Sequence, residues 1–190
     1  MPPTSSDPLD ILLAHNQWAT RALLEKTRAL AREQFHKPFP IGPAERGGLH
    51  AILTHVVSAM RRWADRIAAR PVRPTIERPP PGWTQPTEAK DRTPDELLAL
   101  LDDATADLRA VLADARRRGL GSIVKVELWS PQGMKSYTFT AGGALTHVLT
   151  HGHYHRAQCM NILRHLNVPG LSDKLTDIDV CDWQHEVEGG

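Results

Sequence analysis

The sequence predicts an all-α protein, a four-helix bundle that carries one small β-hairpin before its last helix. Three observations lead to this fold. Four segments repeat apolar residues with a period near 3.6, a Pro-rich segment separates the second from the third, and two β-rich runs precede the fourth. The chain has 190 residues, 41% of them hydrophobic, which is enough for one domain with a substantial core. We therefore expect a single domain over residues 1–190, with its core at about 7–168 and a tail at 169–190.

The first helix is expected over residues 8–35. Asp7 and Pro8 form an N-cap followed by proline at the first helical position. Residues 36–48 then hold Pro and Gly at a density that no helix tolerates. The second helix is expected over residues 49–67. Its basic end is interpreted as a solvated helix terminus and contains Arg61, Arg62, Arg66 and Arg70.

The segment 70–92 has six prolines and almost no periodic apolar residues, so we expect an extended connection there. About 20 extended residues reach roughly 60 Å, which exceeds the length of a helix of this size. The second and third helices can therefore run parallel, joined by a long crossover. The third helix is expected to start after the cap Thr93, with Pro94 in its first turn, and to stop at Gly119.

A β-hairpin is expected at residues 123–129 and 135–140, because two β-rich runs flank a Pro/Gly turn. Gly142 and Gly143 are expected to separate it from a fourth helix over residues 144–167, which Pro169 and Gly170 would end. The remaining residues, 171–190, are expected to form a short helix and a frayed end.

Composition excludes several function classes. The formal net charge is +1, which gives no overall attraction to nucleic acid or to an anionic membrane. No stretch approaches 18 consecutive apolar residues, and the first residues lack the pattern of a secretory signal. The chain has only two cysteines, which fits a reducing compartment. We expect a cytoplasmic protein that acts on a small molecule and binds neither nucleic acid nor membrane.

The ten histidines are the best guide to function. In the fourth predicted helix, His147, His151 and His155 share one stripe at i, i+4 spacing, while His153 points the opposite way. Three inward imidazoles are hard to accommodate as ordinary core residues, because each needs a buried partner for its polar nitrogens. Imidazole is also the commonest transition-metal ligand. This spacing favours a metal or catalytic site.

A further ligand should come from another helix. His55 is the best candidate because it lies on the apolar face of the second helix, whereas His50 falls on the outer face. His15 in the first helix is a weaker candidate. The remaining histidines near helix ends or in the tail are expected to face solvent, and these are His36, His165 and His185.

These residues resemble the DinB/YfiT-like family of metal-binding four-helix bundles. The resemblance rests on the LTHVVSAMRRW run around His55, the HVLTHGHYHRAQ run at 147–158 and the NQWA run at 16–19, and it extends from about residue 9 to 167. It implies that His55, His151 and His155 are the metal triad, with His147 a frequent additional histidine. It also implies parallel second and third helices, and a homodimer. Ala157 departs from the glycine that the family usually has at this position.

A three-histidine site leaves coordination positions for water or substrate, as catalytic zinc sites do. All-nitrogen ligands favour zinc or nickel, with iron as a third option. The family resemblance implies thiol S-transferases that use a low-molecular-weight thiol, and a hydrolase is the other enzymatic reading. The predicted fourth helix has no Asp or Glu beside His151 or His155 to act as a base, so thiol transfer ranks ahead. The alternative is a non-catalytic metal-binding stress-response module.

Other side chains are candidates for the surroundings of the site. Arg156 can anchor an anion or pair with a carboxylate across a helix interface, Gln158 can orient a ligand, and Asn16 and Trp18 can line the pocket mouth. Cys159 is either a soft extra ligand or a small buried residue. Three tryptophans outside the helix stripes give modest support to a dimer, because a monomer would leave them exposed, and these are Trp83, Trp129 and Trp183.

Overall fold

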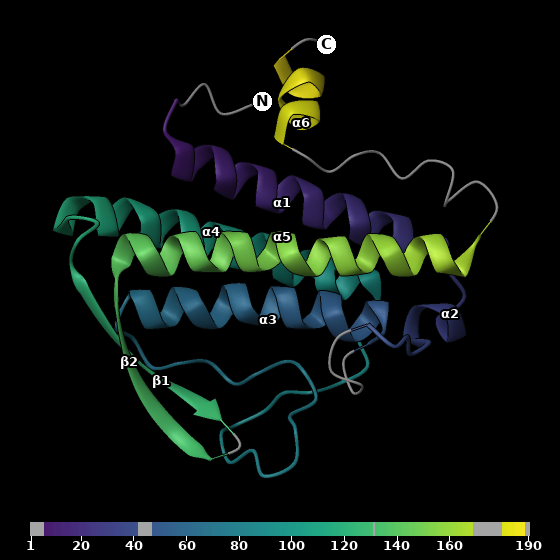
Figure 1. Ribbon diagram of the computed structural model, residues 1–190, viewed down its shortest axis with the longest axis horizontal. Helices are drawn as coiled ribbons and strands as arrows, with labels where there is room; N and C mark the ends of the chain where they lie inside the picture. Colours follow the sequence, from purple (N-terminus) through teal and green to yellow (C-terminus); the bar gives the residue numbers. More distant parts are fainter. Residues whose placement is uncertain (1–5, 42–46, 131, 169–179, 189–190) are drawn as a thin grey trace.

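The computed structural model describes residues 6–41, 47–130, 132–168 and 180–188. The four long helices are α1 (Pro8–Thr27), α3 (Leu49–Ile67), α4 (Pro94–Arg118) and α5 (Ala141–Leu166) (Figure 1). Two short helices, α2 (Arg32–His36) and α6 (Val180–Glu188), and the hairpin β1 (Ile123–Ser130) and β2 (Gly133–Thr140) complete the elements. The predicted bundle with a hairpin before its last long helix is confirmed. No helix in these ranges is long and apolar enough to cross a bilayer.

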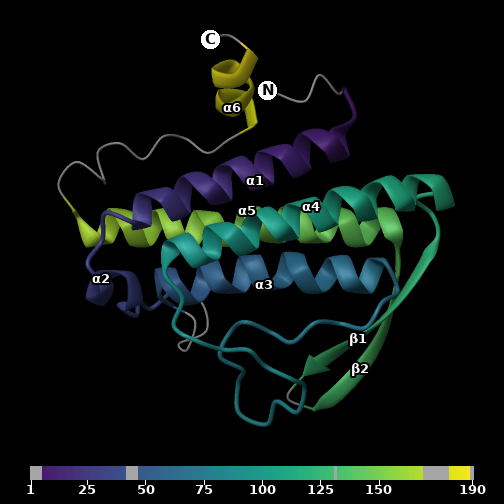
Figure 2. The same cartoon turned by 180° about the vertical axis from the view of Figure 1, so that it is seen from behind.

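The helices on either side of the crossover run parallel, as the sequence predicts. Figures 1 and 2 show α3 and α4 running in one direction, and α1 and α5 in the other. Helix α3 packs against both α4 and α5, and α1 packs against the same two helices from the opposite side. Because residues 68–93 contain no helix, the chain can return along α3 before α4 begins. The crossover and the hairpin therefore lie on the α3 side of the bundle.

Local capping explains where two of the helices begin. The Asp7 carboxylate accepts a hydrogen bond from the Leu9 N–H at 2.9 Å, and Pro8 occupies the first turn of α1. At α4, the Thr93 hydroxyl accepts from the Glu96 N–H at 3.2 Å, while the Glu96 carboxylate accepts from the Thr93 N–H at 2.9 Å. Short sequence motifs alone therefore predict the N-termini of α1 and α4.

The first helix is shorter than predicted. It ends at Thr27, where the hydroxyl donates to the Leu24 carbonyl at 2.6 Å, and the chain restarts as α2 after the extended residue Ala31. The change of direction turns Phe35 into the core, where it is 4% exposed. Burial of this ring explains the break, since no Pro or Gly marks it.

The last long helix starts three residues earlier than predicted. The Thr140 hydroxyl caps it by accepting from the Gly143 N–H at 3.1 Å, so Gly142 and Gly143 lie in its first turn instead of before it. The predicted stop at Pro169 and Gly170 lies outside the described residues. Of the predicted tail, Val180–Glu188 is helical as α6.

The crossover is fixed to the bundle by buried polar contacts. The Asp65 carboxylate, buried on α3, accepts from the backbone N–H and the Nε of Arg73, both at 2.9 Å, and from the Nε of Arg70 at 2.6 Å. Further along, the Arg92 guanidinium donates to the Ile76 carbonyl at 3.0 Å, and Ile76 itself lies in the core. These contacts hold the crossover in one path, although it contains no helix and pairs with itself only at the isolated bridge between Thr75 and Thr87.

The basic end of α3 is only in part the solvated terminus that was predicted. Arg62 is 6% exposed, its guanidinium lies 5.1 Å over the Trp83 ring, and its Nη2 donates to Gln85 at 2.6 Å. Burial lowers the pKa of Arg66 to about 10. The crossover therefore covers Arg62, whereas Arg70, just beyond the end of α3, is exposed as predicted.

The tryptophans also pack within the chain. The rings of Trp83 and Trp129 lie 5.3 Å apart, and Trp183 is only 4% exposed. The premise that a monomer would leave these rings exposed is therefore wrong.

Candidate metal centre

Three imidazole rings meet between α3 and α5. His55 comes from α3, and His151 and His155 come from successive turns of α5. The Nε2 of His151 lies 3.1 Å from the Nε2 of His55 and 3.2 Å from the Nε2 of His155. All three side chains are half-buried, so solvent reaches the cluster. The i, i+4 spacing places two rings on one helix face, and the packing of α3 on α5 brings the third.

The outer nitrogens of two of these rings are held by oxygen acceptors. The Nδ1 of His55 lies 2.9 Å from Glu77 Oε2, and the Nδ1 of His155 lies 2.7 Å from Gln158 Oε1. Each acceptor favours a proton on the Nδ1 that faces it, which leaves a lone pair on the corresponding Nε2. Both lone pairs then point at the Nε2 of His151.

The inner nitrogens of this cluster suit a cation as their common partner. Burial, together with the neighbouring His55 and His155 rings, lowers the pKa of His151 to about 3, so this imidazole stays neutral. A neutral His151 has at most one proton on its Nε2, whereas two lone pairs converge on it. A positive ion placed among the three nitrogens would satisfy all of them at once.

The donor set fits a divalent transition metal. Nitrogens bound to one tetrahedral zinc ion at 2.0–2.1 Å lie about 3.3 Å apart, close to the two spacings observed here. The three ligand atoms lie within 4.8 Å of one another, and Cys159 is not in this group. Cys159 is fully buried, and burial raises the pKa of its thiol to about 12, which agrees with the reading as a small buried residue.

The other histidines fall into distinct settings. His147 is exposed instead of pointing inward as predicted, and it borders the cluster, with its ring 5.6 Å from that of His151 and 4.9 Å from that of Trp63. His153 is exposed on another face of α5, as predicted. His15 is buried beside Trp18 and Trp183, away from the cluster. His36 and His50 lie together, 4.3 Å between ring centroids, instead of facing solvent separately.

Asn16 and Arg156 form a buried pair at the interface of α1 and α5. The Nη1 of Arg156 donates to the Asn16 side-chain oxygen and, at 3.2 Å, to the Thr20 hydroxyl. Within the described residues no carboxylate contacts this guanidinium, and burial lowers its pKa to about 10. Arg156 therefore ties two helices together through neutral acceptors, and Trp18 lies half-buried beside His15 on the same side of the bundle.

Gly152 makes room for this pair. A Cβ at this position would lie 2.9 Å from Arg156 Nη1 and closer still to the Asn16 side-chain oxygen. We expect Gly152→Ala to lower the free energy of unfolding by about 1–2 kcal/mol, because overpacking outweighs the gain of about 1 kcal/mol that alanine normally gives in a helix. Urea unfolding measures the change. At Gly142, where a new Cβ would approach no atom closer than 3.4 Å, the same substitution should not destabilise; equal effects at both sites would refute the packing argument.

Glu77 is the residue that sequence reasoning missed. It lies in the crossover, 22 positions from His55, in a segment without periodicity. Its neighbour Ile76 enters the core and Arg92 holds the Ile76 carbonyl, which brings the Glu77 carboxylate to the His55 ring. No local signal marks it, since its role depends on how the crossover folds.

The sequence of residues 5–178 matches the DinB family. No curated protein matches the chain. The family match covers all four long helices and the three clustered histidines.

Proposed function

The chain belongs to the DinB family, and on that premise we propose that it binds one divalent metal ion through His55, His151 and His155 and acts as a metal-dependent enzyme. The observation that carries this proposal is the convergence of three Nε2 atoms, at 3.1 and 3.2 Å from one another through His151, which are spacings that suit the ligands of one tetrahedral ion. Zinc and nickel are the ions that an all-imidazole donor set favours, with iron a third option.

Thiol transfer is the reaction class that the site supports best, ahead of hydrolysis. When bound, the ion would supply a Lewis acid that lowers the pKa of a thiol or water at an open position. Within the described residues, the carboxylate found at the triad is that of Glu77, and its hydrogen bond holds it at the outer nitrogen of His55, on the other side of the ring from the inner Nε2. A thiol needs less help from a base, since its own pKa is near 8.5.

The side chains around the triad would position its ligands. Glu77 and Gln158 fix the orientation of His55 and His155, and each keeps the inner nitrogen free of a proton. His151 has burial and two neighbouring rings to keep it neutral. The protein thus presents three imidazole nitrogens to one point in space.

Glu77 offers a specific test of this positioning. We expect Glu77→Gln to weaken zinc binding about 10–100-fold, because a carboxylate behind a ligand raises the basicity of the imidazole and fixes its tautomer. Competition with a chromogenic chelator measures the affinity. Glu88→Gln, an exposed carboxylate of the same crossover, should leave it unchanged. Equal affinity in both variants and the parent would remove Glu77 from the site.

The reaction class is tested by assaying metal-loaded and metal-stripped protein with a panel of low-molecular-weight thiols and electrophiles. We expect thiol consumption that requires the metal and is lost in His151→Gln. Metal-dependent ester or amide hydrolysis without thiol consumption would favour the hydrolase. Tight metal binding without turnover of any combination of thiol and electrophile would favour the non-catalytic metal-binding module instead.

We also propose a homodimer. The family resemblance implies it, and the hairpin adds three separate exposed apolar side chains, with Ile123 60% exposed and Met134 and Tyr137 each 42% exposed. Sedimentation equilibrium at micromolar concentration should give twice the chain mass of 21.1 kDa. A mass of 21.1 kDa would rule the dimer out.

A further inference from the structure

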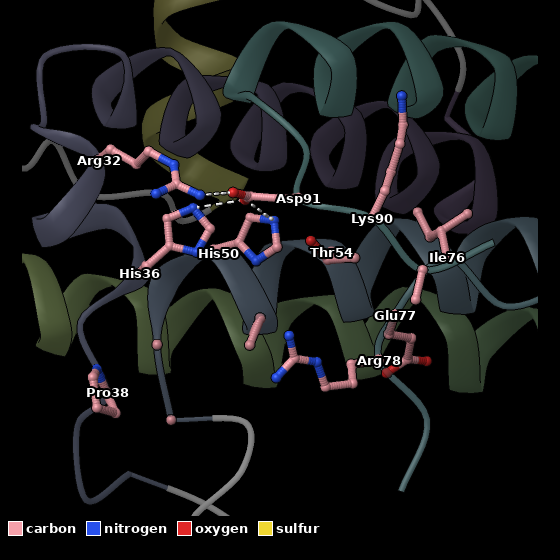
Figure 3. Close-up of a pocket in the computed structure, with 14 residues that line it drawn as sticks. Arg32, His36, Pro38, His50, Thr54, Ile76, Glu77, Arg78, Lys90 and Asp91 are labelled. Atoms are coloured by element: carbon pink, nitrogen blue, oxygen red, sulfur yellow. Dashed lines mark hydrogen bonds and ion pairs between the residues drawn. The ribbon is translucent and has the colours of Figure 1, made fainter. Parts of the chain in front are cut away.

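A second group of metal-ligating side chains lies outside the triad. It occupies one end of a cavity of about 540 Å³ that is lined by α2, the start of α3 and the crossover. Figure 3 shows His36, His50 and Asp91 turned toward one another at this end, with Arg32 beside them. His36 ends α2, His50 lies in the first turn of α3, and Asp91 lies just before α4, so the cluster joins three separate elements.

The distances within the cluster suit one small cation. Asp91 Oδ1 lies 2.9 Å from His36 Nε2 and 3.7 Å from His50 Nε2, and the three ligand atoms all lie within 4.8 Å of one another. Ligand atoms at 2.0–2.2 Å from a shared ion lie about 2.9–3.6 Å apart when their angles are 90–110°. The two distances from Asp91 Oδ1 are close to that range, and the two imidazole nitrogens lie within 4.8 Å of each other.

The state of His50 leaves room for a cation. Its Nε2 accepts a hydrogen bond from the Arg92 backbone N–H at 3.3 Å, so this nitrogen has a lone pair and no proton. The lone pair points to the Arg92 N–H, and a cation bound to His50 Nε2 would take the place of this long hydrogen bond.

Asp91 is oriented by a partner on its other oxygen. Arg32 Nη2 binds Oδ2, which turns Oδ1 toward the two imidazoles. The Phe35 ring packs edge-on against both His36 and His50, with centroids at 5.5 and 5.4 Å. Each of the three candidate ligands is thus oriented by a neighbouring side chain, as the ligands of metal sites usually are.

We propose that His36, His50 and Asp91 form a second binding site for a divalent transition-metal ion, separate from the triad. Two imidazoles and one carboxylate are a donor set for zinc, iron or manganese, and the adjoining cavity leaves coordination positions for water or for a ligand. The positive charge of Arg32 opposes a cation nearby, so this site binds more weakly than the triad.

The two sites are separable by stoichiometry. Equilibrium dialysis of the full chain against zinc, with metal content measured by elemental analysis, should give two equivalents for the parent protein. Asp91→Asn and His36→Gln should each lose the weaker equivalent and keep the tighter one. His153→Gln, an exposed histidine remote from the cluster, should keep both. Circular dichroism checks that each variant is folded.

A His151→Gln variant distinguishes the second site from the proposed function. If only the triad is wrong, this variant binds as much metal as the parent, while Asp91→Asn still loses one equivalent. If Asp91→Asn and His36→Gln bind as much zinc as the parent, the second site is refuted whatever the triad does. Loss of the weaker equivalent in His153→Gln instead would also refute it, since it would assign that zinc to the surface.

Discussion

His151→Gln should lose the tightly bound metal ion. His151 lies at the centre of the triad, within 3.2 Å of both other Nε2 atoms, so its loss leaves only two imidazoles. We expect the affinity for zinc to fall by more than about 100-fold, because loss of a ligand should cost more than loss of a group, such as Glu77, that only hydrogen-bonds a ligand. Elemental analysis after dialysis against a mild chelator should show that the tight equivalent is absent.

The same experiment has two matched controls on α5. His153→Gln removes an exposed imidazole two positions away and should retain the tight ion. His147→Ala removes a ring that borders His151 at 5.6 Å without reaching its Nε2, and its effect should lie between the other two. If His151→Gln retains a full tight equivalent while His153→Gln loses it, the assignment of the ligand face is wrong.

Asp65→Asn should be the most destabilising of the substitutions considered. The Asp65 carboxylate is 2% exposed and accepts three hydrogen bonds from Arg70 and Arg73. Breaking a buried ion pair costs about 3–5 kcal/mol, and because both arginines keep Asp107 as a partner we expect roughly 3 kcal/mol. Asp103→Asn, an exposed aspartate on α4, should change the free energy of unfolding by less than about 0.5 kcal/mol.

The difference in the free energy of unfolding between the parent and Asp65→Asn should become smaller at acidic pH. Burial alone would raise the pKa of Asp65, but the hydrogen bonds from Arg73 and Arg70 outweigh it, so the pKa lies below its usual value. A lowered pKa in the folded state contributes stability above the unfolded value of about 3.9, and that stability is lost as pH falls below it. The gap between parent and Asp65→Asn should therefore be constant near neutral pH and shrink below about pH 4. A gap that widens on acidification would contradict this account of Asp65.

Much of the fold is predictable because local signals decide it. The Asp7–Pro8 start of α1, the Thr93 and Glu96 capping box of α4 and the six prolines of the crossover act over a few residues each. The break between α1 and α2 is different. It follows from burial of Phe35 by distant parts of the chain, and no helix breaker announces it.

In the candidate site, too, some residues are predictable from local signals and others depend on tertiary packing. His151 and His155 are predictable from helix geometry, and His55 from its apolar neighbours. Glu77 is not, because its contact with His55 depends on the path of a crossover that has no periodic pattern. The burial of Arg62 is unpredictable for a related reason, because the ring that covers its guanidinium is Trp83 of the same crossover.

The cluster of His36, His50 and Asp91 also depends on tertiary packing instead of on a local sequence pattern. His36 and His50 each look solvent-facing from their own segment, and only the packing of α2 against α3 brings the two rings to 4.3 Å. Asp91 then joins them from the end of the crossover. Side chains from separate, irregular segments carry no common sequence signal, so their meeting is visible only in the fold.

The most direct test of the central claim is a crystal structure of the zinc-loaded protein with anomalous diffraction data at the zinc edge. The account predicts an anomalous peak among the Nε2 atoms of His55, His151 and His155, at about 2.0–2.2 Å from each nitrogen. An empty triad in crystals that hold zinc at any other position would contradict it.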